Sequence, residues 1–320
     1  MATVAGRTMI LNRALPSATS RSICRTSIRT NTVWANGRPP LTKIVATIGP
    51  ASEHLPVLPQ AVAAGMRVMR INFSHATPDE VELRMTNLAG SSGEFEGQDN
   101  MRAILLDTKG PEIRMGGLEV CKGKETPSEN RKNKILFETG KKVTLSTDPK
   151  WDGAGDESTI FVSYGNIAAT VGPGSKVLLD DGLIGMTVES VGDGEVVCVV
   201  DNTNEIGERK GVNLPNASVD LPAMSDKDKA DISYGIANDM DFVAASFIRT
   251  AAQVEDIRGH INACMAEHWP AGHVAPLIIS KIESQEAVDN FEEILAVSDG
   301  IMVARGDLGV EVPLHQVASP

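Results

Sequence analysis

The stretch PLIISKIESQEAVDNFEEILAVSDGIMVARGDLG, residues 276–309, decides the fold. Two short apolar runs within it, 277–279 and 301–304, are typical of buried strands. Between them apolar residues recur at helical spacing, and we expect Ser284 to cap this helix and Asp299 with Gly300 to end it. The sequence therefore predicts a strand, a helix and a second, parallel strand joined by a right-handed crossover.

Polar side chains follow both of these strands. Lys281 and Glu283 stand two residues apart after the first strand, so they point to the same side of the chain, and Asp307 follows the second strand. In barrels built of repeated βα units, chemistry is placed at these carboxyl ends. Carboxylate oxygens suit a hard divalent metal, and a lysine beside them suits a phosphoryl group. An ordinary surface ion pair between Lys281 and Glu283 is the alternative interpretation.

The same βα pattern occurs in other parts of the chain. Strands are predicted at 42–48, 66–75, 102–110 and 241–247, and helices at 58–64, 80–88, 227–238 and 251–267. Residues 91–100 are predicted to form a loop. Counting both strands of the opening stretch, six βα-type strands are expected, whereas a closed barrel needs eight.

A different pattern separates the third of these strands from the fourth. Hairpins are predicted to pair 177–179 with 183–186 and 187–191 with 196–200, which indicates a small all-β domain. No Gly-rich dinucleotide fingerprint or Walker A spacing follows any strand. The predicted fold is therefore a (β/α)8 TIM-type barrel of which about six of eight strands are present, with an all-β insertion; an open six-stranded sheet is the alternative.

Composition and charge limit the classes of function. The net charge of −12 argues against a nucleic-acid-binding surface, and no apolar run is long enough to span a membrane. Residues 1–38 contain six arginines, many Ser and Thr and no acidic residue, which is typical of a mitochondrial or plastid transit peptide; a disordered cytosolic extension is the alternative. The cysteines lack metal-binding spacing and are expected to be reduced thiols: Cys24, Cys121, Cys198 and Cys264.

Seven motifs, in this order, resemble the pyruvate kinase family. They are KIVATIGP at 43–50, RINFSH at 70–75, DTKGPEIR at 107–114, GVNLP at 211–215, ASFIR at 245–249, ISKIE at 279–283 and MVARGDLG at 302–309. The resemblance implies the last step of glycolysis, in which the phosphoryl group of phosphoenolpyruvate passes to ADP and gives pyruvate and ATP. It also implies a leader at 1–38, barrel parts at 39–111 and 221–320, and a β-barrel lid domain at 112–220.

The resemblance assigns the metal and phosphate chemistry to four side chains. Glu283 and Asp307 would hold Mg²⁺ or Mn²⁺, and Asp307 would also contact the substrate. Lys281 would act as a catalytic residue by lying against the transferring phosphoryl group. Arg70, also catalytic and substrate-binding, would hold a phosphate through its bidentate guanidinium.

A monovalent cation is implied as a second cofactor. Asn72, Ser74, Asp107 and the carbonyl of Thr108 resemble the family's K⁺ cage, and all offer the oxygen atoms that a hard cation requires. Family members that work without K⁺ tend to have a lysine at the position of Glu112, so the glutamate favours a requirement for K⁺.

The remaining implied residues bind the two substrates. The backbone around Ala304 and Gly306 would offer N–H groups to the substrate carboxylate. His75, Arg114 and Lys210 would contact the nucleotide, the last of them from the lid domain. For His75 and Lys210, the alternative is an ordinary solvated side chain.

Two loop positions differ from the family pattern. The family usually has glycine where this chain has Ala76 and Asn216. Asparagine tolerates a positive φ, so we expect Asn216 to preserve the shape of its loop.

The resemblance also defines partners, location and alternatives. Phosphoenolpyruvate and ADP or ATP are the expected partners, with neither nucleic acid nor membrane, and the full-length family is tetrameric and cytoplasmic. The last two barrel strands and the carboxyl-terminal domain of the family are not matched. A catalytically inactive, truncated relative that acts through a partner is one alternative. A lyase or aldolase that uses phosphoenolpyruvate or pyruvate with a bound metal, and no ADP, is another.

Overall fold

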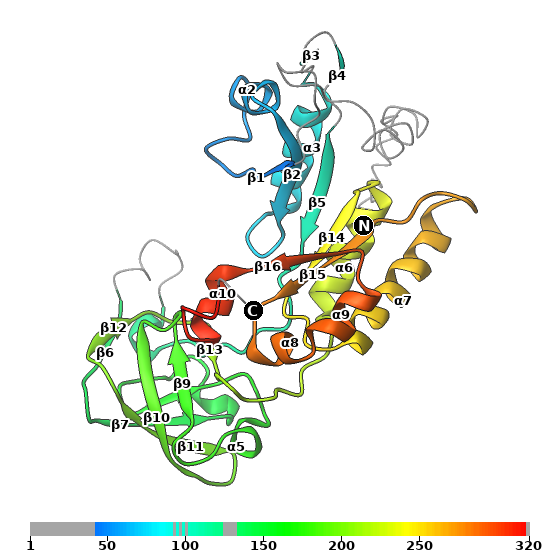
Figure 1. The fold of residues 1–320 in the computed structure, drawn as a ribbon. Coiled ribbons are helices and arrows are strands. Elements are labelled where there is room, and N and C mark those ends of the chain that lie inside the picture. Colours follow the sequence, from blue (N-terminus) through cyan, green and yellow to red (C-terminus); the bar gives the residue numbers. More distant parts are fainter. Residues whose placement is uncertain (1–41, 92–93, 96–97, 100–101, 124–132, 318–320) are drawn as a thin grey trace, which may run out of the picture. The chain divides into compact units, whose positions relative to one another are not determined.

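A computed structural model describes residues 42–91, 94–95, 98–99, 102–123 and 133–317 (Figure 1). The predicted leader at 1–38, with Cys24, lies outside these residues. The chain divides into two compact units, one formed by residues up to 71 with 77–104, the other by 72–76 with the residues from 105 onward. Within the described residues, no helix is long and apolar enough to cross a membrane.

The first unit contains two βα pairs. Strand β1 (Ile44–Thr47) runs parallel to β2 (Met66–Asn72), and helices α2 (Val57–Ala63) and α3 (Pro78–Ala89) follow them. A capping box at Thr77 fixes the start of α3, and its buried Arg84 donates from Nε to Glu53 at 2.7 Å. These four elements confirm the sequence prediction.

The prediction that residues 91–100 form a loop is wrong in part. Two short strands, β3 (Glu94–Phe95) and β4 (Gln98–Asp99), pair antiparallel there. Strands of two residues are too short for a period-two pattern to be recognised in the sequence.

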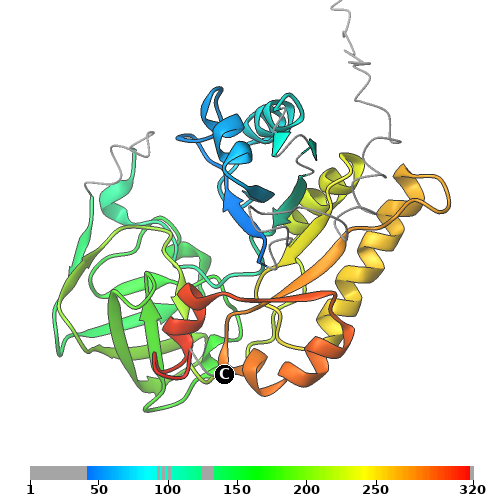
Figure 2. The same cartoon turned by 45° about the horizontal axis from the view of Figure 1, so that its top comes forward.

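The second unit contains four parallel strands in the order β5 (Ala103–Asp107), β14 (Phe242–Ala245), β15 (Leu277–Ile282) and β16 (Gly300–Val303), of which β5 contributes residues 105–107. Helices α6 (Asp226–Ala237), α7 (Ala251–His268) and α9 (Phe291–Val297) lie along one side of these strands (Figures 1 and 2). With β1 and β2, all six predicted βα strands are present, and the prediction of an incomplete α/β barrel with an all-β region is confirmed.

Two predictions for the opening stretch need correction. The single helix expected after Ser284 is two helices, α8 (Gln285–Asp289) and α9. The helix is interrupted at Asn290, whose Nδ2 donates to the Arg249 carbonyl at 2.9 Å. The second strand was expected to be buried, but β16 is only partly covered, and Val303 is 42% exposed. Among the described strands β16 pairs with β15 alone, so one edge has no neighbour.

The all-β region forms a second fold within this unit. One sheet has the order β13 (Val212–Asn213), β9 (Lys176–Leu179), β10 (Ile184–Val191), β11 (Glu195–Val200), β7 (Lys142–Ser146) and β8 (Thr159–Phe161). A smaller one pairs β6 (Ile135–Phe137) with β12 (Asn204–Ile206), and the region also holds helix α5 (Ile167–Thr170). The predicted hairpins are present, but the expected strands at 183–186 and 187–191 are one continuous strand, β10.

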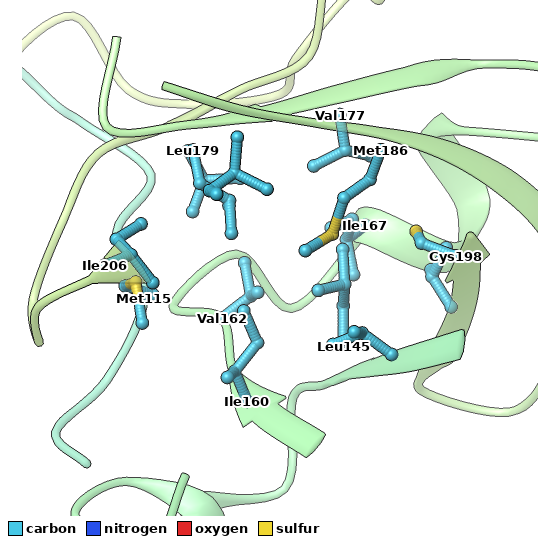
Figure 3. Packing of buried hydrophobic residues seen from close by; sticks show 14 of the residues in the cluster. Met115, Leu145, Ile160, Val162, Ile167, Val177, Leu179, Met186, Cys198 and Ile206 are labelled. Atoms are coloured by element: carbon cyan, nitrogen blue, oxygen red, sulfur yellow. The ribbon is translucent and has the colours of Figure 1, made fainter. Parts of the chain in front are cut away.

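An apolar core fills the interior of this region. In Figure 3 the side chains of Leu145, Ile167 and Met186 point toward one another from a strand, a helix and a second strand. All of the fully buried members of the cluster lie between Ile113 and Leu214. The region therefore buries its apolar side chains largely against itself.

Candidate active site

The carboxyl end of β15 carries a buried ion pair. Lys281 Nζ lies 2.9 Å from Oε1 of Glu283, and these residues are 9% and 1% exposed. A surface pair would be solvated, so the alternative interpretation of an ordinary exposed ion pair is wrong. Lys281 Nζ also lies 3.2 Å from Oδ1 of Asp107 at the end of β5. The ammonium therefore sits between two buried carboxylates.

The segment after β14, which contains the ASFIR motif, completes the surroundings of this pair. Ser246 accepts a hydrogen bond from Lys281 Nζ at 2.8 Å. The backbone N–H of Phe247 donates to Oε2 of Glu283 at 2.6 Å, in a left-handed conformation with φ of 57°. Strained backbone of this kind is concentrated at functional sites. Both residues belong to the ASFIR motif at 245–249, but the sequence analysis assigned neither of them a role.

Burial and charge set the protonation of the pair. Burial lowers the pKa of Lys281, but the carboxylates of Glu283 and Asp107 outweigh it, so the pKa is raised and the ammonium stays charged at neutral pH. Burial raises the pKa of Glu283 to about 7, against the opposing effects of Lys281 and the Phe247 N–H. The negative charge of Asp307 adds to this rise. An additional cation beside Glu283 would therefore be stabilising.

Asp307 is brought to the same site by a short helix that the sequence analysis did not predict. Helix α10 (Arg305–Glu311) begins directly after Ala304 and is anchored by the fully buried Leu308. Gly306 and Asp307 fall in its first turn, where backbone N–H groups have no carbonyl partner within a helix. This position is compatible with carboxylate binding by Ala304 and Gly306, which stays a prediction.

A pocket of about 300 Å³ joins these groups to the all-β region. Its walls include Glu283 and Asp307 from the βα part and Arg114 and Lys210 from the all-β part, and His75 also lines it. The structure thus gathers the predicted metal ligands and the predicted nucleotide-binding residues in one cavity of the second unit. Apolar residues form much of the remaining wall: Ile113, Val212, Leu214, Ala217, Val219 and Leu221.

Two basic residues of the pocket, Arg114 and Lys210, already have acidic partners. Arg114 donates from Nε to Glu112 at 2.6 Å and from Nη1 to the Arg209 carbonyl at 2.9 Å. Lys210 Nζ lies 3.1 Å from Oδ1 of Asp180. The pairing of Glu112 with Arg114 was not foreseen, since the sequence analysis considered Glu112 only in relation to K⁺. Both cations remain half-exposed, so an anionic ligand can compete for them.

Of the four predicted K⁺ ligands, Asp107 contacts Lys281 directly, and Thr108 is linked to it through Ser246. The N–H of Phe73 donates to the Asp107 carbonyl at 3.0 Å, which brings the segment of Asn72 and Ser74 next to Asp107. Asn72 Oδ1 accepts from the N–H of Ser74 at 3.0 Å. The carbonyl of Thr108 accepts a hydrogen bond from the buried hydroxyl of Ser246 at 2.7 Å. The donor set is made of oxygen atoms alone, which fits a hard monovalent cation.

The predicted divalent site consists of Glu283 and Asp307. Within the described part of the chain, Oε1 of Glu283 is a buried oxygen without a well-oriented hydrogen bond, although Lys281 is close. Such an oxygen is suited to a metal ion. No group of three or more His, Cys, Asp or Glu side chains in the described residues is arranged to hold a metal.

Arg70 belongs to the first unit. It extends from β2 and donates from Nη1 to Oγ1 of Thr47 at 2.6 Å. Its predicted role in phosphate binding stays a prediction.

Two contacts missed by the sequence analysis join the all-β region to the rim of the βα part. Asn213 Nδ2 donates to Oε1 of Glu311 on α10 at 3.0 Å, and Ser218 Oγ donates to Oε1 of Glu286 on α8 at 3.1 Å. Arg249, 4% exposed, donates from Nη2 to the carbonyl of Leu221 at 2.9 Å, in the segment that leads from β13 to α6. The contacts join residues distant in sequence, so no local pattern indicates them.

Comparison with known proteins identifies a family. The family described as pyruvate kinase, barrel domain, matches residues 40–319. Human pyruvate kinase PKLR is 42% identical over 279 residues, covering 86% of this chain and 46% of that protein. The cytosolic isozyme of pyruvate kinase from Nicotiana tabacum is 41% identical over 281 residues, covering 87% of this chain and 51% of that protein.

A solved structure gives the same result. The crystal structure of a pyruvate kinase from Cryptosporidium parvum matches with a TM-score of 0.75 and 36% identity, over 87% of this chain and 53% of that one. The chain spans about half the length of the curated relatives it matches.

Proposed function

The chain belongs to the pyruvate kinase family, and from this premise we propose that it transfers the phosphoryl group of phosphoenolpyruvate to ADP. In this reaction the bond between phosphorus and the enol oxygen breaks, a bond to the terminal phosphate of ADP forms, and the enolate takes up a proton to give pyruvate. One observation carries the proposal: a single pocket contains Glu283 and Asp307 together with Arg114 and Lys210.

Lys281 is the residue proposed to stabilise the transferring group. Its ammonium is buried and held by fixed acceptors, so it needs little reorganisation when negative charge develops near it. Phosphoryl transfer depends mainly on such positioning and electrostatics. The same charge would stabilise the enolate oxygen that leaves the phosphorus.

Two cations are proposed to bind beside this lysine. Glu283 and Asp307 would hold Mg²⁺ or Mn²⁺, which when bound neutralises charge on the phosphoryl oxygens. Asn72, Ser74, Asp107 and the Thr108 carbonyl would hold K⁺. The buried Glu283 oxygen and the all-oxygen donor set around Asp107 support this assignment.

The substrates are proposed to bind at the two walls of the pocket. His75, Arg114 and Lys210 would contact the nucleotide, with residues 112–220 acting as a lid over it. Ala304 and Gly306 would offer backbone N–H groups to the substrate carboxylate, and Arg70 would hold a phosphate. Cytoplasmic location, and a tetramer formed by the whole protein, remain proposals drawn from the family.

The test is pyruvate release from phosphoenolpyruvate by the purified chain, with Mg²⁺ and K⁺, in the presence and absence of ADP. Lys281→Met is expected to reduce turnover roughly 10²- to 10³-fold, since it removes a preorganised charge. Lys229→Met, at a half-exposed lysine on α6 that pairs loosely with Asp226, is the matched control and should keep the parent rate. Mn²⁺ binding followed by electron paramagnetic resonance shows whether each variant keeps the site.

Three outcomes would contradict the proposal. Equal turnover in Lys281→Met and the parent would remove the role of this lysine. Turnover that does not need ADP would favour a lyase or an aldolase. No turnover by the parent chain would favour the inactive relative.

A further inference from the structure

The hydroxyl group of Ser246 lies between the proposed K⁺ ligands and the proposed catalytic lysine. Its Oγ is 2.8 Å from Lys281 Nζ, 2.7 Å from the Thr108 carbonyl and 3.2 Å from Oδ1 of Asp107. Ser246 is 2% exposed, so these contacts are shielded from bulk solvent. The hydroxyl is therefore shared between three groups that belong to two different sites.

The hydrogen-bond directions at this hydroxyl follow from its chemistry. A serine has one hydrogen to donate and can accept as well. The ammonium of Lys281 can only donate, so Ser246 accepts from it and gives its own hydrogen to an oxygen. The shorter distance assigns that hydrogen to the Thr108 carbonyl. The N–H of Ser246 donates to Oγ1 of Thr108 at 3.0 Å, which fixes the serine on the end of β5.

Asp107 is the group for which the two sites compete. Its Oδ1 lies 3.2 Å from Lys281 Nζ, yet its carboxylate is also a proposed K⁺ ligand. An ammonium without a neutral acceptor would rely more on Asp107 and would reduce the negative charge available to K⁺. Ser246 provides that neutral acceptor.

We propose that Ser246 is a positioning residue that accepts one hydrogen bond of the Lys281 ammonium, so that the ammonium and K⁺ can share the carboxylate of Asp107. The inference rests on the proposed function, because it uses the proposed K⁺ ligands. Ser246 acts through Lys281 and Asp107 and is not assigned a contact with substrate. Loss of its hydroxyl should weaken K⁺ binding and displace the ammonium.

The chain offers a matched control one residue from the lysine. Ser280 is fully buried on β15, and its Oγ lies 2.7 Å from Oγ of Ser298. Ser246→Ala and Ser280→Ala therefore each remove one buried, hydrogen-bonded hydroxyl. Both should lower thermal stability to a similar extent, and only the first touches the proposed cation site.

The deciding experiment is thermal unfolding of the whole chain during titration with KCl, without divalent metal or substrate, with choline chloride holding the ionic strength constant. A ligand that binds the folded state raises the melting temperature, so the K⁺ concentration at half-maximal rise reports affinity. We expect this concentration to increase roughly tenfold in Ser246→Ala, the effect of one lost hydrogen bond, and to stay unchanged in Ser280→Ala. An unchanged or lower value in Ser246→Ala overturns the inference, as does a parent chain without any K⁺-specific rise.

Turnover gives an independent measurement. In Ser246→Ala we expect kcat to fall roughly tenfold at saturating K⁺, while KM for phosphoenolpyruvate changes less than about threefold, because the lysine is displaced rather than removed. An increase in KM for phosphoenolpyruvate with an unchanged kcat contradicts the positioning role. If the parent chain does not turn over, the proposed function of the chain fails, and the K⁺ titration still decides the inference.

Discussion

Phe247 and Gly110 show how single residues shape the candidate site. Phe247 has φ of 57° and aims its N–H at Glu283, while Gly110 has φ of 73° and lies directly against Ser246 and Phe247. A Cβ added to Gly110 would come within 2.8 Å of both neighbouring side chains. Only glycine allows this close approach together with this backbone conformation.

We therefore expect Gly110→Ala to lower the free energy of unfolding by about 2–4 kcal/mol, because strain and overpacking add. Gly259→Ala, on helix α7 with no atom within 4 Å of the added Cβ, should raise it by about 0.5–1 kcal/mol. Thermal and urea unfolding of both variants check this. Equal stability of Gly110→Ala and the parent would show that the loop relaxes without cost.

Glu112 offers a second test at the residue scale. Glu112→Lys places an ammonium where K⁺-independent relatives tend to carry one, so the ratio of rates with and without K⁺ should fall toward one. The substitution also breaks the hydrogen bond to Arg114, and Glu112→Gln serves as the control because it removes the same ion pair without adding a positive charge. The prediction is wrong if the two variants respond to K⁺ in the same way.

At the scale of elements, side-chain contacts decide where helices and strands begin and end. Ser284 caps α8 as predicted, with its Oγ accepting from the Ala287 N–H at 3.2 Å. Asn290 ends that helix early through its bond to the Arg249 carbonyl. A cap is a local pattern and can be read from the sequence, whereas the break depends on a loop 41 residues away.

Strand β11 provides a prediction about a thiol. Cys198 is fully buried in the core of the all-β region, and burial, with a smaller effect of Asp201, raises its pKa to about 12. The thiolate is the reactive form, so Cys198 should resist iodoacetamide at mildly alkaline pH in the folded chain and react fully in guanidinium chloride. Peptide mass spectrometry measures this. Rapid labelling in the folded chain would show that the core opens.

The raised pKa of Cys198 also predicts a pH dependence of stability. The folded state favours the neutral thiol, so its contribution is complete below the ordinary pKa of 9.0 and is lost as pH rises toward about 12. Cys198→Ala should reduce this alkaline loss of stability relative to the parent. An identical pH profile would contradict the assignment.

At the scale of the whole molecule, the all-β region has the features of an independent domain. The buried members of its core lie between Ile113 and Leu214. Its two ends are joined, since the N–H of Val212 donates to the Ile113 carbonyl at 2.9 Å and Arg114 bridges Gly211. An inserted domain can fold alone when its two chain ends lie side by side and it has a hydrophobic core of its own.

We expect residues 112–220, expressed alone, to fold with a cooperative thermal transition and a β-type circular dichroism spectrum. Leu145→Asp, which places an unpaired charge in the core, should abolish that transition and serves as the control. A fragment without cooperative unfolding would show that the contacts of Asn213 and Ser218 with the βα part are needed for folding.

The sequence by itself determined the alternation of strands and helices, the cap at Ser284 and the placement of Lys281 and Glu283 on the same side of the chain, because these depend on periodicity or on residues two to four positions apart. It also anticipated Asn216, which has φ of 61°. Through its seven motifs, the sequence also indicated which residues to expect at the candidate site.

Tertiary structure alone decided the contacts among those residues. Ser246 meets Lys281, 35 positions away, and Asp107, 139 positions away, because three neighbouring parallel strands end at one edge. Strand order and register fix such distances, and neither is encoded in a local pattern. The sharing of Asp107 between an ammonium and a proposed cation site is therefore a property of the fold.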